Sequence, residues 1–194
     1  MPDPSSQLDR LEANQWHALY RCRTDPDHRK KLIPKLQSLL ENPEAEIQQG
    51  ALRAVARIGP CQQVGALATL VPFVATLSQS EDLLTRKTAI GCLHNIGGDH
   101  PQSAVPALIK ACDDPQLLEG ALLALVDFKK AASPALPLYH RLAGHKQAKI
   151  RRLALRGLAA MEAGDKRSRE IIQAALHDKS QAVRQLAEKL SASN

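Results

Sequence analysis

Aromatic residues are scarce in this chain of 194 residues, where Phe, Trp and Tyr together fill 3% of the positions. The core must therefore be built from aliphatic side chains, because few large rings are available to fill it. No run of about 18 apolar residues occurs, which excludes a membrane-spanning helix by length. Residues 1–10 are polar and lack the basic and apolar segments of a secretory signal. These absences favour a cytoplasmic protein that makes no membrane contact.

Patterns of residues that carry chemistry are also missing. The four cysteines are scattered without a C-x-x-C pair, so reduced thiols are favoured over disulfides. The seven histidines form no His-Glu pair and no clustered metal-ligand motif. No Gly-rich phosphate loop and no nucleophile elbow occur. The sequence therefore predicts no catalytic residue, no metal site and no cofactor, and we interpret the chain as a non-enzymatic protein.

What the chain does contain is a repeated pattern of apolar and small residues. Its template is an apolar residue (Thr in one copy), alanine four places on, a small residue at seven and larger apolar residues at eight and eleven. These offsets lie on one face of a helix, and alanine in the middle of that face allows close approach of a neighbouring helix. The copies begin at Ile47, Thr85, Leu117, Ile150 and Val183, and their alanines are Ala51, Ala89, Ala121, Ala154 and Ala187.

Each recurring helix is preceded by another helix, which carries a proline in the first four copies and Glu170 in its place in the fifth. The prolines lie 11 to 13 residues before the starting points and follow an apolar residue in each of these four copies; they are Pro34, Pro72, Pro106 and Pro137. A unit of two helices repeated about every 33 residues is typical of a solenoid, in which stacking supplies the core that one hairpin lacks. We therefore predict an all-α, right-handed α-α superhelix of about five helical hairpins. Residues 1–27 would be a tail and a capping helix, and residues 28–194 the repeat array.

The second helices resemble those of the HEAT-repeat family. Val183-Arg184 with Ala187, and Ile150-Arg151 with Ala154 and Leu158, are similar to the V-R-x-x-A-x-x-A-L signature of that family. The resemblance covers roughly residues 28–192 and implies an armadillo-like α-solenoid that acts as a scaffold for partners. The family's usual Asp-to-Arg spacing is matched by Asp178 and Arg184, to which we assign the interaction between these residue types.

A mostly basic surface is predicted on the side of the second helices that faces away from the alanines. It consists of the residues two, six and ten places after each starting point, and we call it the second-helix surface. In the family this surface lines the concave side of the stack. Its basic members are Arg53, Arg57, Lys87, Arg152, Arg156 and Lys189; its acidic members, Glu119 and Asp127, lie in the third repeat. With a net charge of +6, the leading hypothesis is a scaffold that binds an acidic protein surface or segment there.

Three alternatives remain open at the level of sequence. The basic residues could follow a nucleic-acid backbone, although the surface offers no aromatic platform for base stacking. The chain could also be a subunit of a lyase or another enzyme complex, by analogy with the fold. Finally, the apolar residues Leu122, Leu123, Leu153 and Leu155 are either buried between repeats or exposed as a protein-docking patch.

Overall fold

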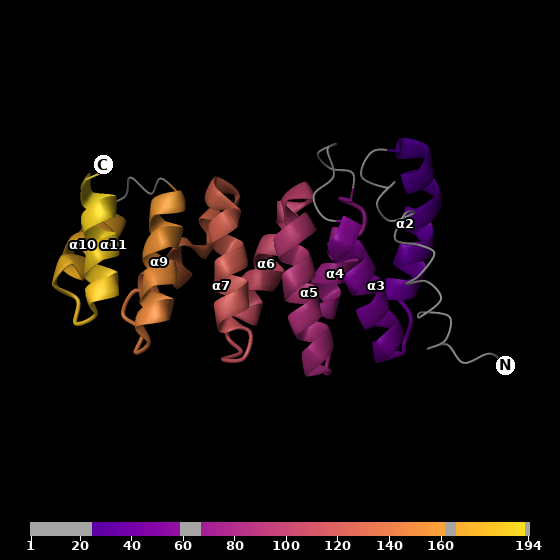
Figure 1. The fold of residues 1–194 in the computed structure, drawn as a ribbon, viewed down its shortest axis with the longest axis horizontal. Coiled ribbons are helices and arrows are strands. Elements are labelled where there is room, and N and C mark those ends of the chain that lie inside the picture. The colour runs from indigo at the N-terminus through magenta and orange to yellow at the C-terminus, as the bar shows by residue number, and fades with distance from the viewer. Residues whose placement is uncertain (1–24, 59–66, 162–165, 193–194) are drawn as a thin grey trace. The chain divides into compact units, whose positions relative to one another are not determined.

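The computed structural model describes residues 25–58, 67–161 and 166–192, and these residues form helices joined by short turns (Figure 1). They divide into two compact units, Met1–Ala111 and Cys112–Asn194. Within the described ranges there is no β-strand, and no helix is long and apolar enough to cross a membrane. The predicted capping helix falls in residues 1–24, outside the described residues. The division into residues 1–27 and 28–194 stays a prediction.

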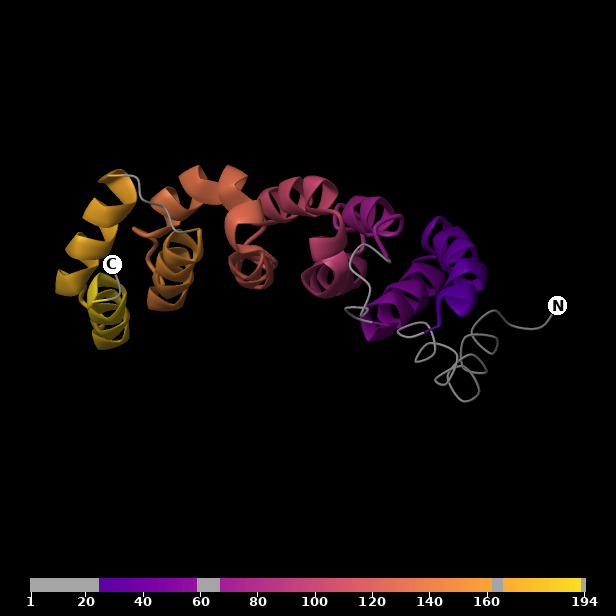
Figure 2. The ribbon, with the colours of Figure 1, turned by 90° about the horizontal axis from the view of Figure 1, so that it is seen from above.

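In the first unit, residues 25–58 and 67–111 form two helical hairpins and one further helix. The helices are α2 (Pro26–Leu40), α3 (Ala45–Ile58), α4 (Val71–Leu77), α5 (Leu83–Ile96) and α6 (Pro101–Ala111), with the short 3-10 helix η1 (Gly97–Asp99) before α6. In this unit α3 and α5 lie side by side in one layer, and α4 packs between α2 and α6 in the other (Figure 2). Asp25 caps α2 by accepting hydrogen bonds from the backbone N–H groups of Asp27 and His28.

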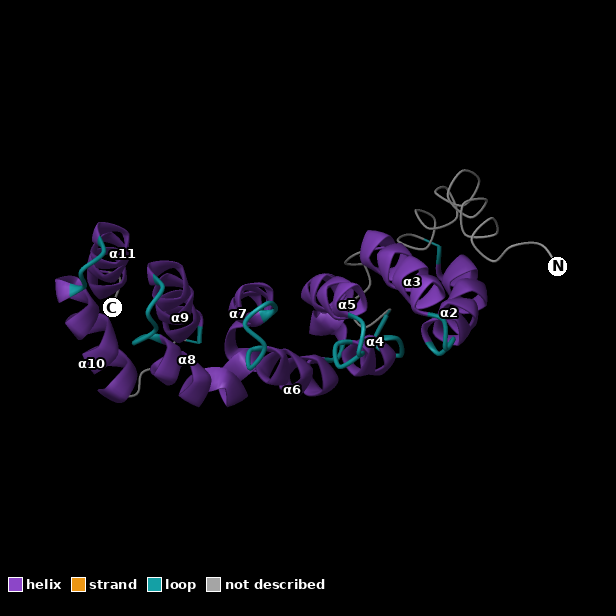
Figure 3. Ribbon diagram, turned by 90° about the horizontal axis from the view of Figure 1, so that it is seen from below, coloured by secondary structure: helices purple, strands orange, loops and turns teal. Residues whose placement is uncertain are grey.

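The second unit repeats this two-layer arrangement. Its elements are α7 (Leu118–Asp127), η2 (Lys129–Ala135), α8 (Leu136–Leu142), α9 (Ala148–Ala160), α10 (Lys166–Ala174), η3 (Ala175–His177) and α11 (Gln181–Ala192). Here α7, α9 and α11 form one layer, while α8 and α10 cover it on one side (Figure 3). The last hairpin shares its core with the preceding one, because Leu155 of α9 packs with Ile172 and Val183. No described hairpin of this unit encloses its apolar face alone, as expected for stacked repeats.

Each of the five matching alanines lies on the buried face of its helix. Ala51, Ala89, Ala121, Ala154 and Ala187 lie on α3, α5, α7, α9 and α11, and each is at most 1% exposed. The aliphatic residues at the eighth place of the template, Val55, Leu93, Leu125 and Leu158, are equally buried. The predicted fold class, an all-α solenoid of HEAT-like helical hairpins, is confirmed.

The ring of Tyr139 on α8 lies directly against Gly157 on α9. Tyr139 is fully buried, and a Cβ atom built on Gly157 would lie 2.2 Å from its ring carbon Cε1. In the other clear copies the small residue is Ala54, Cys92 or Ala124, and the position of the tyrosine is occupied by a smaller aliphatic residue. The glycine therefore compensates for the largest side chain found at the facing position.

The arginines of the V-R-x-x-A signature donate hydrogen bonds to backbone carbonyls of the turn that precedes their own helix. Arg86 donates hydrogen bonds to the carbonyl oxygens of Ser80 and Glu81, at 2.9 and 2.8 Å. Arg151 binds the corresponding carbonyls of His145 and Lys146, and Arg184 binds that of Asp178. Gln48, which replaces the arginine in the first copy, reaches the Asn42 carbonyl at 2.7 Å. In each case an accepting carbonyl lies six residues before the donor. Arg86 and Arg151 also bind the carbonyl that lies five residues before them.

Candidate protein-docking surface

All six basic residues that the sequence assigned to the second-helix surface are exposed. Arg53 and Arg57 lie on α3, Lys87 on α5, Arg152 and Arg156 on α9, and Lys189 on α11. Their exposure follows from the repeat, because the opposite face of each helix carries the buried alanine. The structure places Arg53, Arg57 and Lys87 in the first unit and the other three in the second. Nearly all of the net positive charge of the chain belongs to residues 112–194, so the electrostatic potential is more positive around the second unit than around the first.

A groove between α7 and α9 lies on this surface in the second unit. Its volume is about 200 Å³, and it is lined by Glu119, Leu123, Lys149, Arg152, Leu153 and Arg156. Arg152 and Arg156 are one turn apart on α9 and therefore share a face. Leu123 of α7 is half-buried and supplies an apolar contact opposite them. The groove thus combines two cations with an aliphatic wall.

The groove keeps a net positive charge, because only some of its charged side chains are paired. Lys149 forms an ion pair with Glu119 across the groove, so each neutralises the other. Among the described residues, none forms an ion pair or hydrogen bond with the side chain of Arg152 or Arg156. Two guanidinium groups are therefore available to an incoming anion, and each offers a planar set of N–H donors suited to a carboxylate.

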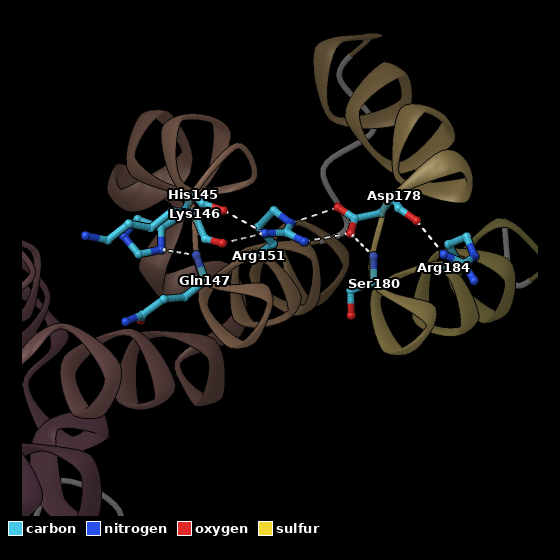
Figure 4. Close-up of polar contacts among 7 residues, drawn as sticks. All are labelled: His145, Lys146, Gln147, Arg151, Asp178, Ser180 and Arg184. Atoms are coloured by element: carbon cyan, nitrogen blue, oxygen red, sulfur yellow. Dashed lines mark hydrogen bonds and ion pairs between the residues drawn. The ribbon is translucent and has the colours of Figure 1, made fainter.

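Arg151 and Arg152 are adjacent in sequence but have different environments. The Arg151 side chain is only 6% exposed and forms a two-point contact with the Asp178 carboxylate, with Nε–Oδ2 and Nη2–Oδ1 distances of 2.7 Å (Figure 4). Asp178 also accepts a hydrogen bond from the Ser180 backbone N–H. The expected Asp178–Arg184 side-chain pair is wrong: Arg184 binds the backbone carbonyl of Asp178, and the carboxylate turns to the preceding repeat. Arg151 thus fixes α9 against the last hairpin and leaves Arg152 at the surface.

The Arg151–Asp178 contact predicts loss of stability in acid. Hydrogen bonds from Arg151, and secondarily from Ser180, hold the pKa of Asp178 below its ordinary value of 3.8. A depressed folded-state pKa means that the unfolded chain binds the proton more tightly, so this contribution is complete above the ordinary pKa and lost as pH falls through the folded-state value. Urea midpoints measured between pH 2 and pH 7 should therefore fall more steeply for the wild type than for Asp178→Asn. Parallel curves would contradict this assignment.

In the first unit, polar side chains of the second-helix surface form hydrogen bonds between α3 and α5. Gln49 donates to Asp82 Oδ2 at 3.0 Å, and Asn95 donates to the carbonyl of Ala56 at 3.3 Å. Asp82 is the N-cap of α5, and its bond to the Thr85 backbone N–H keeps the pKa of this carboxyl below its ordinary value. These polar residues are engaged with the neighbouring repeat, and the exposed basic residues lie among them.

Most of the side chains that line the groove could be predicted from the sequence. Glu119, Leu123, Arg152 and Arg156 were second-helix positions, whereas Lys149 was not recognised. The exposed stripe of Lys149, Arg152 and Arg156, spaced by three and four residues, is the signal that could have revealed it. Of the four leucines that were left undecided, Leu122, Leu153 and Leu155 are buried and Leu123 is half-buried, so burial between repeats accounts for most of them.

Comparison with known proteins identifies the repeats and the fold. Residues 33–126 match the family model described as HEAT repeats. No curated protein matches the sequence. Among solved structures, the chain is similar to an engineered protein with 20% identity and a TM-score of 0.65, over 98% of this chain and 95% of the other.

Two further solved structures have similar folds. One is a designed armadillo repeat protein in complex with the peptide (KR)4, with 16% identity, a TM-score of 0.69 and coverage of 96% and 97%. The other is the complex of CpcE and CpcF of phycocyanin lyase from Nostoc sp. PCC7120, with 19% identity, a TM-score of 0.53 and coverage of 96% of this chain and 75% of that chain. At these identities the similarity concerns the fold.

Proposed function

This chain belongs to the HEAT-repeat family, and from that premise we propose that it is a non-enzymatic scaffold that binds an acidic protein partner on its second-helix surface. The observation that carries the proposal is the pair of exposed arginines, Arg152 and Arg156, which have no partner among the described residues and border the groove between α7 and α9. A fold neighbour that holds a peptide, the designed armadillo repeat protein, supports this use of stacked helical hairpins.

Features of the buried cysteines support a scaffold in a reducing compartment. Cys92 and Cys112 are free and buried. Burial raises the pKa of both thiols, that of Cys112 to about 12, so neither is suited to act as a nucleophile at neutral pH. Their roles are those of small apolar residues in the core. We include a cytoplasmic location in the proposal, since free structural thiols are typical of that compartment.

Reversing the charge of the two groove arginines should remove the partner. We expect Arg152→Glu/Arg156→Glu to lower the recovery of acidic partners at least tenfold, because two attractive contacts become repulsive. The measurement is affinity purification from the native cell with the intact chain as bait, followed by quantitative mass spectrometry.

A matched control is offered by Arg167 and Arg169 of α10. Both are exposed and lie in the same unit, but in the other layer of helices. Arg167→Glu/Arg169→Glu changes the net charge by the same amount and should leave the partners in place. Equal partner lists for the wild type and both variants would remove the proposal.

Binding to nucleic acid is the alternative hypothesis for the function of the same basic residues. It predicts an affinity that falls steeply with salt, because phosphate contacts release counterions. The groove presents aliphatic rather than aromatic side chains beside its arginines, and aromatic platforms are the usual support for unpaired bases. The apolar wall therefore favours a protein partner. Salt-dependent binding of duplex or single-stranded probes, lost in Arg152→Glu/Arg156→Glu, would reverse this preference.

A further inference from the structure

We propose that the groove between α7 and α9 takes a short extended acidic segment in which an aliphatic residue stands between two carboxylates, as in Asp-Leu-Asp. This inference rests on the proposed function and specifies the occupant of the same site. It follows from three properties of the groove: the spacing of its arginines, its small volume and the different character of its two walls.

The spacing of the arginines sets the spacing of the carboxylates. Arg152 and Arg156 are four residues apart on α9, so their Cβ atoms are about 5–6 Å apart on one face. In an extended chain, alternate side chains point to the same side and are separated by about 6–7 Å. Two acidic residues with one residue between them therefore match the two guanidinium groups, whereas directly adjacent acidic residues point to opposite sides.

The size of the groove favours an extended segment over a helix. Its volume is about 200 Å³, less than the roughly 300–1,000 Å³ of ordinary ligand pockets. A helix with its side chains is about 10–12 Å across and would rest on the rim of such a groove. A single extended strand, by contrast, can place individual side chains inside it.

The two walls of the groove explain why the middle residue should be aliphatic. One wall is α9, with Arg152 and Arg156, and the other is α7, with the half-buried Leu123. An extended segment that lies between them directs alternate side chains to opposite walls. When the carboxylates meet the arginines, the residue between them meets Leu123, where an aliphatic side chain removes apolar surface from water. Glu119 does not oppose the acidic segment, because Lys149 neutralises it.

The test compares peptides of identical length and charge that differ in the order of their residues or in the middle residue. Nine-residue peptides containing Asp-Leu-Asp, Asp-Asp-Leu or Asp-Ser-Asp between Gly and Ser residues are titrated into the ¹⁵N-labelled full chain at low salt, and affinity is read from shifts of the amide signals. We expect Asp-Leu-Asp to bind at least fivefold more tightly than either of the other peptides. The preference should disappear in Leu123→Ser, and binding should be lost in Arg152→Glu/Arg156→Glu but kept in Arg167→Glu/Arg169→Glu.

The possible failures separate this inference from the proposed function. Equal affinities for the three peptides, all dependent on Arg152 and Arg156, would overturn the alternating pattern and leave the acidic docking surface intact. Equal loss of binding in both charge-reversed variants would show non-specific attraction and overturn the assignment to the groove. Displacement of the peptide by duplex DNA, together with tighter binding of the DNA, would overturn the choice of a protein segment. Absence of peptide binding would overturn the inference even if affinity purification retained its acidic partner.

Discussion

Gly157→Ala is expected to destabilise the second unit by about 2–3 kcal/mol, although alanine is ordinarily the better helix former by about 1 kcal/mol. The added Cβ would lie 2.2 Å from Cε1 of Tyr139, far inside van der Waals contact. Tyr139 has no room to move away, because its side chain is fully buried between α8 and its neighbours. The measurement is urea unfolding of the full chain followed by circular dichroism, with hydrogen exchange to localise the loss.

Two further substitutions test the physical cause of this effect. Tyr139→Leu combined with Gly157→Ala should recover most of the lost stability, because it installs the pairing found in the third repeat, where Leu108 and Ala124 occupy these places. Gly91→Ala in α5 is the control: nothing lies within 4 Å of its added Cβ, so it should stabilise the chain by about 0.5–1 kcal/mol. A neutral or stabilising Gly157→Ala would show that the contact between α8 and α9 is looser than described.

Asp178→Ala is the second substitution for which we expect a large loss, about 2–4 kcal/mol. It leaves the guanidinium of Arg151 with a side-chain exposure of 6% and no carboxylate beside it. The carbonyls of His145 and Lys146 still accept hydrogen bonds from Nη1, but they do not neutralise the charge. Because the pair connects α9 to the last hairpin, α10 and α11 should lose hydrogen-exchange protection first.

An exposed ion pair in the same unit provides the comparison. Lys166 and Glu170 are one turn apart on α10, with side-chain exposures of 87% and 63%. Replacing both with alanine should change the free energy of unfolding by no more than about 0.5 kcal/mol. If Asp178→Ala were equally mild, the contact with Arg151 would be a consequence of the packing of the last hairpin and not a cause of it.

The helix faces were predictable because their cause is local. An alanine four places after each starting point can be read from the sequence, and all five alanines are buried as expected. The partner of Asp178 was not predictable in the same way. The spacing from Asp178 to Arg184 lies within one repeat, whereas Arg151 is 27 residues away. Which of two arginines the carboxylate meets depends on how neighbouring hairpins stack, and the spacing within a repeat does not determine this.

The candidate site shows the same division between local and non-local information. Exposure of Arg152 and Arg156 follows from their positions on α9 relative to Ala154. The neutralisation of Glu119 does not, since Lys149 lies on a different helix, 30 residues further along the chain. Sequence alone therefore suggested that the third repeat interrupts the basic surface. The ion pair removes that interruption within the groove.

The side-chain bonds to turn carbonyls have a consequence for how the repeats diverge. A carbonyl oxygen is supplied by every amino acid, so the bonds from Gln48, Arg86, Arg151 and Arg184 do not themselves restrict which side chain the accepting residue carries. The third repeat has Leu118 at this place, and its turn is closed by Asp114, which accepts a hydrogen bond from the Gln116 backbone N–H through its side chain. The other four turns have such a side-chain acceptor as well, in Asn42, Ser80, His145 and Asp178. The third repeat differs in that the side chain of Leu118 cannot donate to the turn carbonyls, so loop grafts that keep the acceptor and the length of the turn should be tolerated less well there than at the other four.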